Sequence, residues 1–548
     1  MSSKPSRTKF FQPMGKGQVP PIRFESENSA TRTLRVLMAF SMLAVVFLCI
    51  YVVFRDLAIF NSGYNPVDYI FAVALIISEL FIAVHAVGYF WAVFRASVRA
   101  NTARTEVFTG FANPPVAVYL ATYNEPEEII EDTLASLLGL EYPNLQIYLN
   151  CDSPKAAQAQ MAEALAKKYR VNFYHRVPNT GYKAGGINLF LGRLGKDLPY
   201  AKYMIVLDAD SKPVRTFASE LVAIAEKNPK IAFIQTPQYY GNTADSPVAM
   251  GASASQSVFY EYICEAKAES KAMICCGTNV LFRVEALLSV GGFDESSVTE
   301  DFATSLRLHS NGWESHYHNA VYVMGVGPET MGAYFVQQMR WAIGTFGIFL
   351  RGVLPRLFKP NLTFGQKFEY FLSGSYYFVG VTQMIQLICP VAFLLFGVKP
   401  LIANPVAYLV AFVPNLVFSN ILFYFSMKQR DYRMKSLIAS QAINFITFWV
   451  YARAVWGALL NKRISFGVTP KGQGEPLPWI VFWPQLLFMA ASLVAAIVGI
   501  YHLATTGDLP LIFNIFWALY HTTLLSSIFY FNRRVTLGQP EYFFDRYA

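Results

Sequence analysis

The chain of 548 residues is 54% hydrophobic and 16% aromatic, and charged side chains make up only 15% of it. These values depart from those of soluble proteins and indicate a membrane protein with a soluble part. The net charge of +9 lies largely beside apolar stretches, which is typical of cytoplasmic loops and argues against nucleic acid as a partner. The six cysteines form no CxxC pair, so neither a disulfide framework nor a zinc site is expected.

A cytosolic tail is predicted for residues 1–36, because they are polar and basic and lack the apolar core and cleavage site of a signal peptide. The two apolar stretches that follow, Leu37–Phe54 and Tyr69–Phe94, are each long enough to cross a bilayer, which takes about 20 residues. Basic residues flank the pair on its outer sides, and the loop between the stretches is nearly free of them. Residues 37–94 are therefore predicted to form a transmembrane hairpin with both ends in the cytosol.

Short β-rich runs alternate with helical patterns between about Pro114 and Gly327. Residues 105–345 are therefore predicted to form a cytosolic α/β domain around a parallel sheet. The expected strands are Val116–Leu120, Leu145–Leu149, Tyr203–Leu207 and Ile231–Gln235. Ala156–Lys168 is an example of the helical pattern between them.

Two carboxylates, Asp208 and Asp210, follow the predicted strand Tyr203–Leu207. Residues two apart on an extended chain face the same side, so both can bind one divalent cation and the diphosphate that it bridges. A solvated strand end would explain such a pair in most proteins. Here the pair lies at the carboxyl end of a parallel strand, where open α/β sheets bind ligands, which favours a metal site for Mg²⁺ or Mn²⁺.

Polar groups follow the other predicted strands as well. Thr122, Tyr123 and Glu125 lie in a loop that offers hydroxyl and carboxylate groups to a nucleoside, and Asp152 ends a further strand. Lys183 lies in a glycine-rich turn that could hold phosphate at the start of a helix. An ordinary glycine turn explains that segment equally well.

An acidic pair and a helical face lie further along the chain. Glu300 and Asp301 open a predicted helix, where they serve either as capping residues or, for Asp301, as the general base that deprotonates an acceptor hydroxyl. Gln337, Arg340 and Trp341 have the i, i+3, i+4 spacing of one helical face. That face offers an amide, a cation for a leaving diphosphate and an indole for stacking on a sugar, although an amphipathic helix at the membrane edge has the same pattern.

Five apolar runs lie within residues 346–548. Four of them are predicted to span the membrane: Tyr370–Phe396, Ala407–Met427, Trp479–Tyr501 and Leu511–Phe531. The fifth run, Leu437–Leu460, has basic residues at both ends and polar residues inside it, so an interfacial helix is predicted there. Six spans then place the C-terminus in the cytosol.

The ordered motifs resemble those of the processive family 2 glycosyltransferases, and most closely the bacterial cellulose synthase group. The resemblance extends from about Pro114 to Lys471. It rests on the segments already quoted and on Gln235-Thr236-Pro237 and Cys276-Gly277-Thr278. The segment at about 464–475 is similar to the FxVTxK gating loop of that family, with Phe466, Val468, Thr469 and Lys471 at the motif positions.

The resemblance implies a GT-A type α/β domain inserted between transmembrane helices and an inverting, processive transfer of glucose from UDP-glucose. It implies contacts to the UDP-sugar from Thr122, Tyr123, Glu125, Asp152, Lys183, Asp208, Asp210, Gln337 and Arg340. It makes Asp301 the base, and it implies that Cys276, Gly277, Thr278, Glu300 and Trp341 bind the acceptor. The gating loop would lie over the nucleotide pocket.

Two departures from the cellulose synthase pattern bear on the product. Where the cellulose synthases tend to have two adjacent carboxylates, this chain has one, Asp152. In addition, no PilZ domain is expected after the last span. The compact length is more similar to curdlan synthases, so a β-1,3-glucan is the expected product, with cellulose or a chitin- or hyaluronan-type polymer as alternatives. The expected partners are UDP-glucose, the growing β-glucan chain and the lipid of the bacterial plasma membrane, while accessory export subunits are left unspecified.

Overall fold

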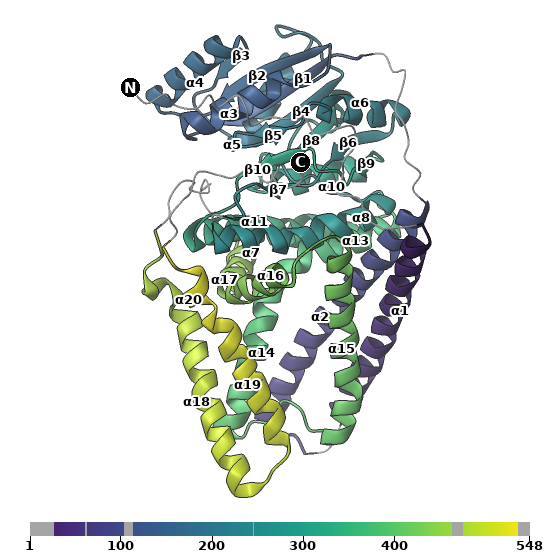
Figure 1. The fold of residues 1–548 in the computed structure, drawn as a ribbon, viewed down its shortest axis with the longest axis vertical. Coiled ribbons are helices and arrows are strands. Elements are labelled where there is room, and N and C mark those ends of the chain that lie inside the picture. Colours follow the sequence, from purple (N-terminus) through teal and green to yellow (C-terminus); the bar gives the residue numbers. More distant parts are fainter. Residues whose placement is uncertain (1–26, 61–62, 103–112, 245, 463–474, 535–548) are drawn as a thin grey trace.

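The structure is a computed structural model that describes residues 27–60, 63–102, 113–244, 246–462 and 475–534. Figure 1 shows an α/β part in the upper half of the molecule and long helices in the lower half. The α/β part comes from the middle of the sequence, and the long helices come from both of its flanks. This is the insertion of a domain between helices that the sequence predicts.

A seven-stranded sheet forms the centre of the α/β part, in the order β3-β2-β1-β4-β8-β6-β9. Its strands are β1 (Val116–Thr122), β2 (Leu145–Cys151), β3 (Asn172–His175), β4 (Tyr203–Asp208), β6 (Ile231–Gln235), β8 (Val280–Arg283) and β9 (Glu314–Tyr317). The prediction of a parallel sheet is wrong at β8, which runs antiparallel to both of its neighbours, β4 and β6. All four residues of β8 are buried, so this short strand has no alternation of polar and apolar residues that would reveal it in the sequence.

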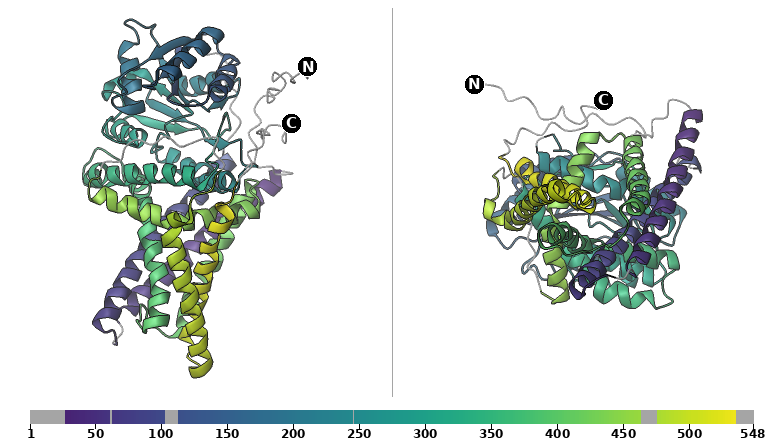
Figure 2. Two further views of the ribbon diagram at one scale, coloured as in Figure 1. Left: turned by 90° about the vertical axis from the view of Figure 1, so that its left-hand side faces the viewer. Right: turned by 90° about the horizontal axis from the view of Figure 1, so that it is seen from below.

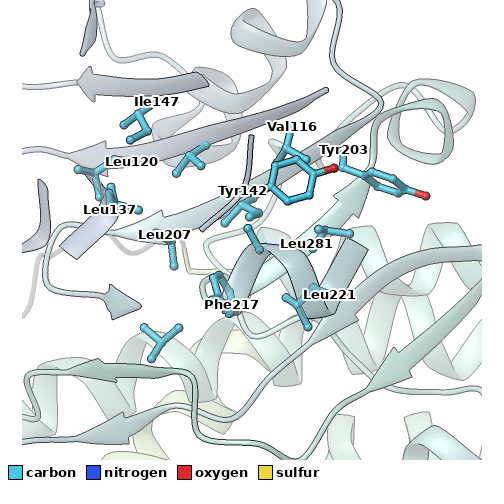
Figure 3. Close-up of a cluster of buried hydrophobic side chains, with 14 of the residues drawn as sticks. Val116, Leu120, Leu137, Tyr142, Ile147, Tyr203, Leu207, Phe217, Leu221 and Leu281 are labelled. Carbon is cyan, nitrogen blue, oxygen red and sulfur yellow. The ribbon is translucent and has the colours of Figure 1, made fainter. Parts of the chain in front are cut away.

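The central strand β1 is buried on both faces. Val118 and Leu120 pack into one hydrophobic core, part of which Figure 3 shows, and Ala117 and Tyr119 pack into a second core on the opposite face. Helices cover the two faces, which explains why the strand is a nearly continuous apolar run. The flanking helices are α3 (Glu127–Leu138), α4 (Ala156–Tyr169), α5 (Tyr182–Arg193), α6 (Phe217–Lys227), α9 (Val284–Ser289) and α10 (Glu300–Ser310).

A smaller sheet of three strands, in the order β5-β10-β7, lies between the large sheet and the helices below it (Figure 1). Its strands are β5 (Lys212–Pro213), β7 (Tyr239–Tyr240) and β10 (Val323–Gly325). Strand β5 follows Asp210 directly, and the backbone N–H of Val326, just after β10, donates to Asp210 Oδ2 at 2.9 Å. The small sheet therefore fixes the second carboxylate of the predicted metal pair.

In the part of the chain that the structure describes, six helical segments are long and apolar enough to cross a membrane: Thr33–Ala58, Pro66–Val98, Phe364–Phe396, Pro405–Gln429, Trp479–Thr506 and Pro510–Phe531. They contain the six predicted spans. They belong to α1 (Glu27–Ala58), α2 (Pro66–Thr102), α13 with α14 (Phe364–Ser375 and Val379–Phe396), α15 (Pro405–Gln429), α18 (Trp483–Thr506) and α19 with α20 (Pro510–Ser526 and Ile528–Phe531). Seen from below, these helices surround a common centre (Figure 2).

The run predicted to be interfacial forms two helices, α16 (Met434–Ile446) and α17 (Phe448–Leu459), which are bent by 45° relative to each other. Helix α16 packs against α7 (Pro247–Val258), and α17 packs against α11 (Met331–Ile348). The left view of Figure 2 shows this pair lying across the top of the spanning helices, beneath α11. Such a position suits an interfacial segment, and the cytosolic orientation of the termini stays a prediction.

Candidate active site

Three of the predicted motifs meet at the carboxyl end of β4. Lys183, in the first turn of α5, donates from Nζ to Asp208 Oδ1 at 2.5 Å and to the carbonyl oxygen of Gly277 at 2.8 Å. The backbone N–H of Asp208 donates to Thr278 Oγ1 at 2.9 Å. The glycine-rich turn, the paired carboxylates and the Cys276–Thr278 loop therefore form one site.

The loop that carries Gly277 is held from below by Gln235, the last residue of β6. The Gln235 amide nitrogen donates to the Thr278 carbonyl oxygen at 2.8 Å, and Gln235 Oε1 accepts from the Cys276 N–H at 2.9 Å. Gln235 is fully buried, and its amide nitrogen also donates to the Thr236 carbonyl oxygen at 2.8 Å, so its partners are protein groups. The backbone of Gly277 has φ = +81°, a conformation that favours glycine.

Asp301 reaches the same loop from the first turn of α10. A Cβ atom on Gly277 would lie 3.1 Å from Asp301 Oδ2, so this carboxylate oxygen lies directly beside the bare glycine. Asp301 Oδ1 accepts from the N–H of Phe302 at 2.7 Å, and Ser305 Oγ donates to the Asp301 carbonyl oxygen at 2.7 Å. The capping role considered for the acidic pair is thus partly filled by Oδ1, while Oδ2 faces the site.

The acidic pair lies in an environment that disfavours its charge. Burial and the neighbouring charge of Asp301 together raise the pKa of Glu300 to about 7. Burial also raises the pKa of Asp301, while its bond from the Phe302 N–H and the cations Lys183 and Arg340 work in the opposite direction. Since Lys183 and Arg340 act on both carboxyl groups, both cations lie within electrostatic range of the predicted base.

Lys183 remains a cation in this site. Burial acts to lower its pKa, but the charge of Asp208 and the hydrogen bond to it outweigh burial, so the pKa of Lys183 is raised. A permanent positive charge beside Asp208 is suited to a diphosphate group. The side chain of Asp208 is 44% exposed and can be reached by a cation and its ligand.

The two carboxylates of the predicted metal pair have unequal settings. Asp210 is buried and is fixed by the Val326 N–H, whereas Asp208 is largely open. The described residues contain no group of three or more His, Cys, Asp or Glu side chains that could hold a metal by themselves. Two carboxylates completed by substrate phosphates are a usual donor set for Mg²⁺, so Asp208 and Asp210 fit a metal that binds together with a nucleotide.

Several residues that are predicted to contact the nucleoside form hydrogen bonds within the protein. The Thr122 hydroxyl donates to the Asn150 carbonyl oxygen at 2.9 Å, which joins β1 to β2, and the Tyr123 N–H donates to Glu125 Oε2 at 2.6 Å. Asp152 accepts two hydrogen bonds from Arg176, at 3.0 and 2.9 Å. The role of these residues in binding UDP stays a prediction, and for Asp152 it has to be compatible with this ion pair.

Arg176 is a residue of this site to which the sequence gives no role. Besides Asp152, its guanidinium group donates to the carbonyl oxygens of Thr180 at 2.5 Å and Tyr182 at 2.7 Å. It therefore holds the turn that leads into Lys183. The only signal in the sequence is a basic residue shortly before a glycine-rich turn, which is too common to be assigned.

The helical face of Gln337, Arg340 and Trp341 belongs to α11, which passes beneath the acidic pair. The side chain of Gln337 contacts the Tyr240 hydroxyl group, and Gln337 Oε1 is buried without a hydrogen-bond partner among the described residues. Trp341 is half-buried. Arg340 acts electrostatically on both carboxyl groups of the acidic pair, and the binding roles of Gln337, Arg340 and Trp341 stay predictions.

Cys276 lies next to the base, at the position predicted for the acceptor. Burial raises the pKa of its thiol to about 12, and the Asp301 charge contributes, so Cys276 is a neutral thiol. It therefore offers shape and weak hydrogen bonding to a sugar and no reactive thiolate. The predicted gating loop lies in 463–474, outside the described residues, so Phe466, Val468, Thr469 and Lys471 stay predictions.

Comparisons with known proteins agree with this geometry. Residues 114–344 match the model of the family described as glycosyltransferase like family 2, and residues 288–424 match the model described as cellulose synthase. Residues 114–344 of the chain are thus similar to the family 2 glycosyltransferases. The predicted fold, a GT-A type α/β domain between apolar helices, is thereby confirmed.

Curated relatives that this chain matches are named as cellulose synthases. The cellulose synthase catalytic subunit of Pseudomonas fluorescens is 26% identical over 76% of this chain and 56% of its own length. The cellulose synthase 1 catalytic subunit of Komagataeibacter xylinus is 25% identical over 76% of this chain and 56% of its own length. This chain therefore spans about half the length of the curated relatives that it matches.

Solved structures similar to this chain include a mannosyltransferase of Pyrobaculum calidifontis in complex with GDP-Man and Mn²⁺. It is 14% identical, with a TM-score of 0.47, over 71% of this chain and all of that protein.

Proposed function

We propose that this protein is a processive, UDP-forming hexosyltransferase that extends a β-glucan with glucose from UDP-glucose. The observation that carries the proposal is the position of Gly277 between Lys183, which contacts its carbonyl oxygen, and Asp301, which lies against its Cα. A cation suited to a diphosphate and a carboxylate suited to a base thus both lie beside one glycine. Transfer from a nucleotide-sugar to a hydroxyl group requires both groups to be positioned at one site.

Each charged group then has a distinct task. Asp301 takes the proton of the acceptor hydroxyl as that oxygen attacks the anomeric carbon of the donor sugar. Lys183 and Arg340 stabilise the negative charge that develops on the departing UDP. A divalent metal held by Asp208 and Asp210 would contribute further positive charge beside the diphosphate.

Glu300 is the member of the acidic pair that takes up a proton near neutral pH. Its pKa of about 7 lies far above that of an ordinary glutamate, because burial and the Asp301 charge both disfavour its ionised form. Asp301, which the Phe302 N–H stabilises as a carboxylate, is then the member of the pair that stays ionised.

We also propose that the polymer leaves through the spanning helices below the site. Support comes from buried polar atoms in those helices that have no hydrogen-bond partner among the described residues, which a hydroxyl-rich chain could supply. They are Arg55 Nη2 in α1, Gln383 Oε1 in α14, Gln485 Oε1 and Ser492 Oγ in α18, and His521 Nδ1 in α19. This path runs from beneath α11 towards the far side of the membrane.

For the linkage, the names of the curated relatives favour β-1,4 over the β-1,3 bond expected from the compact length. The test incubates purified protein in lipid with UDP-glucose and Mg²⁺ and digests the product with linkage-specific glucanases. Complete digestion by a β-1,4-glucanase and resistance to a β-1,3-glucanase is the expected result. The reverse pattern would establish the curdlan product instead, and release of UDP without any polymer would contradict processive synthesis.

The assignment of the base is tested with Asp301→Asn. The variant keeps the Phe302 N–H bond through its amide oxygen but cannot accept the acceptor proton, so polymer synthesis is expected to fall by about 10²- to 10⁴-fold. Binding of UDP is expected to change little, because Lys183 and Asp208 are untouched. Undiminished synthesis would remove Asp301 from the mechanism.

A further inference from the structure

A second buried charge cluster lies away from the acidic pair, where spanning helix α15 ends beneath the catalytic domain. Arg430 follows α15 directly, and its guanidinium group lies 3.3 Å from Glu261 Oε2 and 3.2 Å from Glu265 Oε2. The three side chains are 14%, 8% and 11% exposed, respectively. The two glutamates lie in the π-helical segment Phe259–Ile263 and in α8 (Cys264–Glu269), which extend α7.

The catalytic domain contributes polar groups to the same cluster. Asn319, just after β9, donates from Nδ2 to Glu261 Oε2 at 3.2 Å and to Glu265 Oε1 at 2.6 Å. The hydroxyl group of Tyr239, in β7, donates to Glu261. The Tyr239 hydroxyl oxygen also lies 3.2 Å from that of Tyr432, two residues after Arg430. We call these residues the Arg430 cluster; they are Arg430, Glu261, Glu265, Asn319, Tyr239 and Tyr432.

Strand β7 leads from this cluster into the active site. Tyr239 pairs with Met324 of β10, and the next residue, Tyr240, pairs with Gly325. One residue beyond that pair, the Val326 N–H holds Asp210. Tyr240 itself contacts the Gln337 side chain through its hydroxyl group. A shift of β7 would therefore move a predicted metal ligand and a predicted diphosphate contact together.

Stability alone does not account for such a cluster. Burying charges carries a desolvation penalty, and well-packed apolar side chains of similar size often stabilise a protein as well or better. What the cluster adds is a defined geometry, because the guanidinium fork bridges two glutamates that have fixed partners of their own. The end of α15 and the small sheet are thereby held in a fixed position relative to each other.

We propose that Arg430 is a positioning residue that couples the spanning helix α15 to the active site through Tyr239 and β7. The inference rests on the proposed function, and it assigns to the end of α15 the alignment of Asp210 and Gln337 during each transfer. A displacement of about 1 Å in such groups can reduce turnover by about a hundredfold without loss of binding. The coupling therefore affects turnover more than nucleotide affinity.

The test uses the full-length protein in lipid and compares Arg430→Gln, Arg430→Lys and Tyr239→Phe. For each variant, the dissociation constant for UDP and the turnover with UDP-glucose are measured. Arg430→Gln is expected to lower turnover by about tenfold or more while the UDP dissociation constant stays within about twofold, because Lys183 and Asp208 do not contact the cluster. Arg430→Lys retains the charge and is expected to recover part of the turnover.

Tyr239→Phe removes one hydroxyl group and leaves all buried charges paired, so it tests the coupling even where Arg430→Gln fails to fold; a fall of turnover by about threefold is expected. Arg283→Gln is the matched control for a lost buried arginine. Its side chain bonds to the carbonyl oxygens of Ile231 at 3.0 Å and Ala225 at 2.8 Å and takes no part in the Arg430 cluster. It is expected to lower thermal stability and to change turnover and UDP affinity by similar factors, if at all.

Wild-type turnover in both Arg430→Gln and Tyr239→Phe would overturn the inference. A parallel fall of turnover and UDP affinity in these variants, of the kind that general destabilisation produces, would overturn it as well. A wild-type protein that binds UDP but makes no glucan would contradict the proposed function instead, so the two failures are distinguishable.

Discussion

Gly344 of α11 faces Thr299, the residue before the acidic pair, with no room for a side chain between them. A Cβ atom on Gly344 would lie 2.6 Å from both Cγ2 and Oγ1 of Thr299 and 3.0 Å from the Val298 side chain. The close approach of α11 to the loop before Asp301 therefore depends on this glycine. Gly344→Ala is expected to push the two elements apart, to destabilise the protein by about 1–3 kcal/mol and to reduce turnover.

Gly192→Ala in α5 is the matched control, because a Cβ atom there meets nothing within 4 Å. It is expected to be neutral or to stabilise the protein by about 0.5–1 kcal/mol through the better helix propensity of alanine. Thermal unfolding and glucose incorporation are measured for both variants. Equal behaviour of the two would show that α11 and the Thr299 loop are not tightly packed.

Local patterns predicted much of the fold, while the roles of the site residues stay predictions. Strands β1, β2 and β4 follow from apolar runs, although each continues one or two residues beyond its predicted end, and the six apolar helices among the described residues follow from length and hydropathy. The antiparallel β8 could not be predicted, since four buried residues carry no periodicity. The ion pair of Asp152 with Arg176 and the Arg430 cluster join segments far apart in sequence, so no local pattern reveals them.

We predict that metal binding needs both carboxylates, Asp208 and Asp210. In Asp210→Asn the amide oxygen can still accept from the Val326 N–H, so the small sheet is kept while a negative charge is lost. The Mg²⁺ concentration for half-maximal synthesis is expected to rise by about 10-fold or more in Asp210→Asn and in Asp208→Asn. Asp197→Asn, which removes an exposed partner of Arg193, is the control and should leave the Mg²⁺ titration unchanged.

The pairing of Arg176 with Asp152 predicts that both residues are needed to order the turn before Lys183. The two side chains are 7% and 16% exposed, and Arg176 also binds the carbonyl oxygens of Thr180 and Tyr182. Arg176→Met is expected to destabilise the protein by about 3–5 kcal/mol, because it leaves a buried carboxylate without its partner. It is also expected to weaken UDP binding, measured by titration calorimetry.

Asp152→Asn keeps an oxygen for Arg176 and is the milder variant. If Asp152 acts only through Arg176, UDP affinity in Asp152→Asn should fall less than in Arg176→Met. A larger loss of affinity in Asp152→Asn would instead indicate that the carboxylate contacts the nucleotide directly.

The position of α16 and α17 predicts that both ends of this pair lie on the same side of the membrane. Reporter fusions placed after Asp431 and after Asn461 should therefore give the same signal, in agreement with the basic residues at both ends of the segment. Fusions after Ala58 and after Thr506, at the far ends of α1 and α18, should report the opposite side. Opposite signals from Asp431 and Asn461 would make the bent pair a seventh span.

Synthesis is expected to lose rate as the pH falls through neutrality. Burial raises the pKa of Asp301 and brings that of Glu300 to about 7, so the acidic pair takes up a proton well above the range of ordinary carboxyl groups. A protonated pair is a poorer base, and kcat is therefore expected to decline below about pH 7, whereas a base with an ordinary aspartate pKa would hold its rate to about pH 5.

The Glu300→Gln variant distinguishes the contributions of the two carboxyl groups to the pH dependence of kcat. The variant cannot take up the proton that Glu300 binds near pH 7, so the decline is expected to move to lower pH, where Asp301 alone is titrated. The measurement is kcat at saturating UDP-glucose across the range in which UDP binding and thermal stability stay constant. If kcat declined over the same pH range in Glu300→Gln as in the wild-type protein, Glu300 would not share the proton of the site.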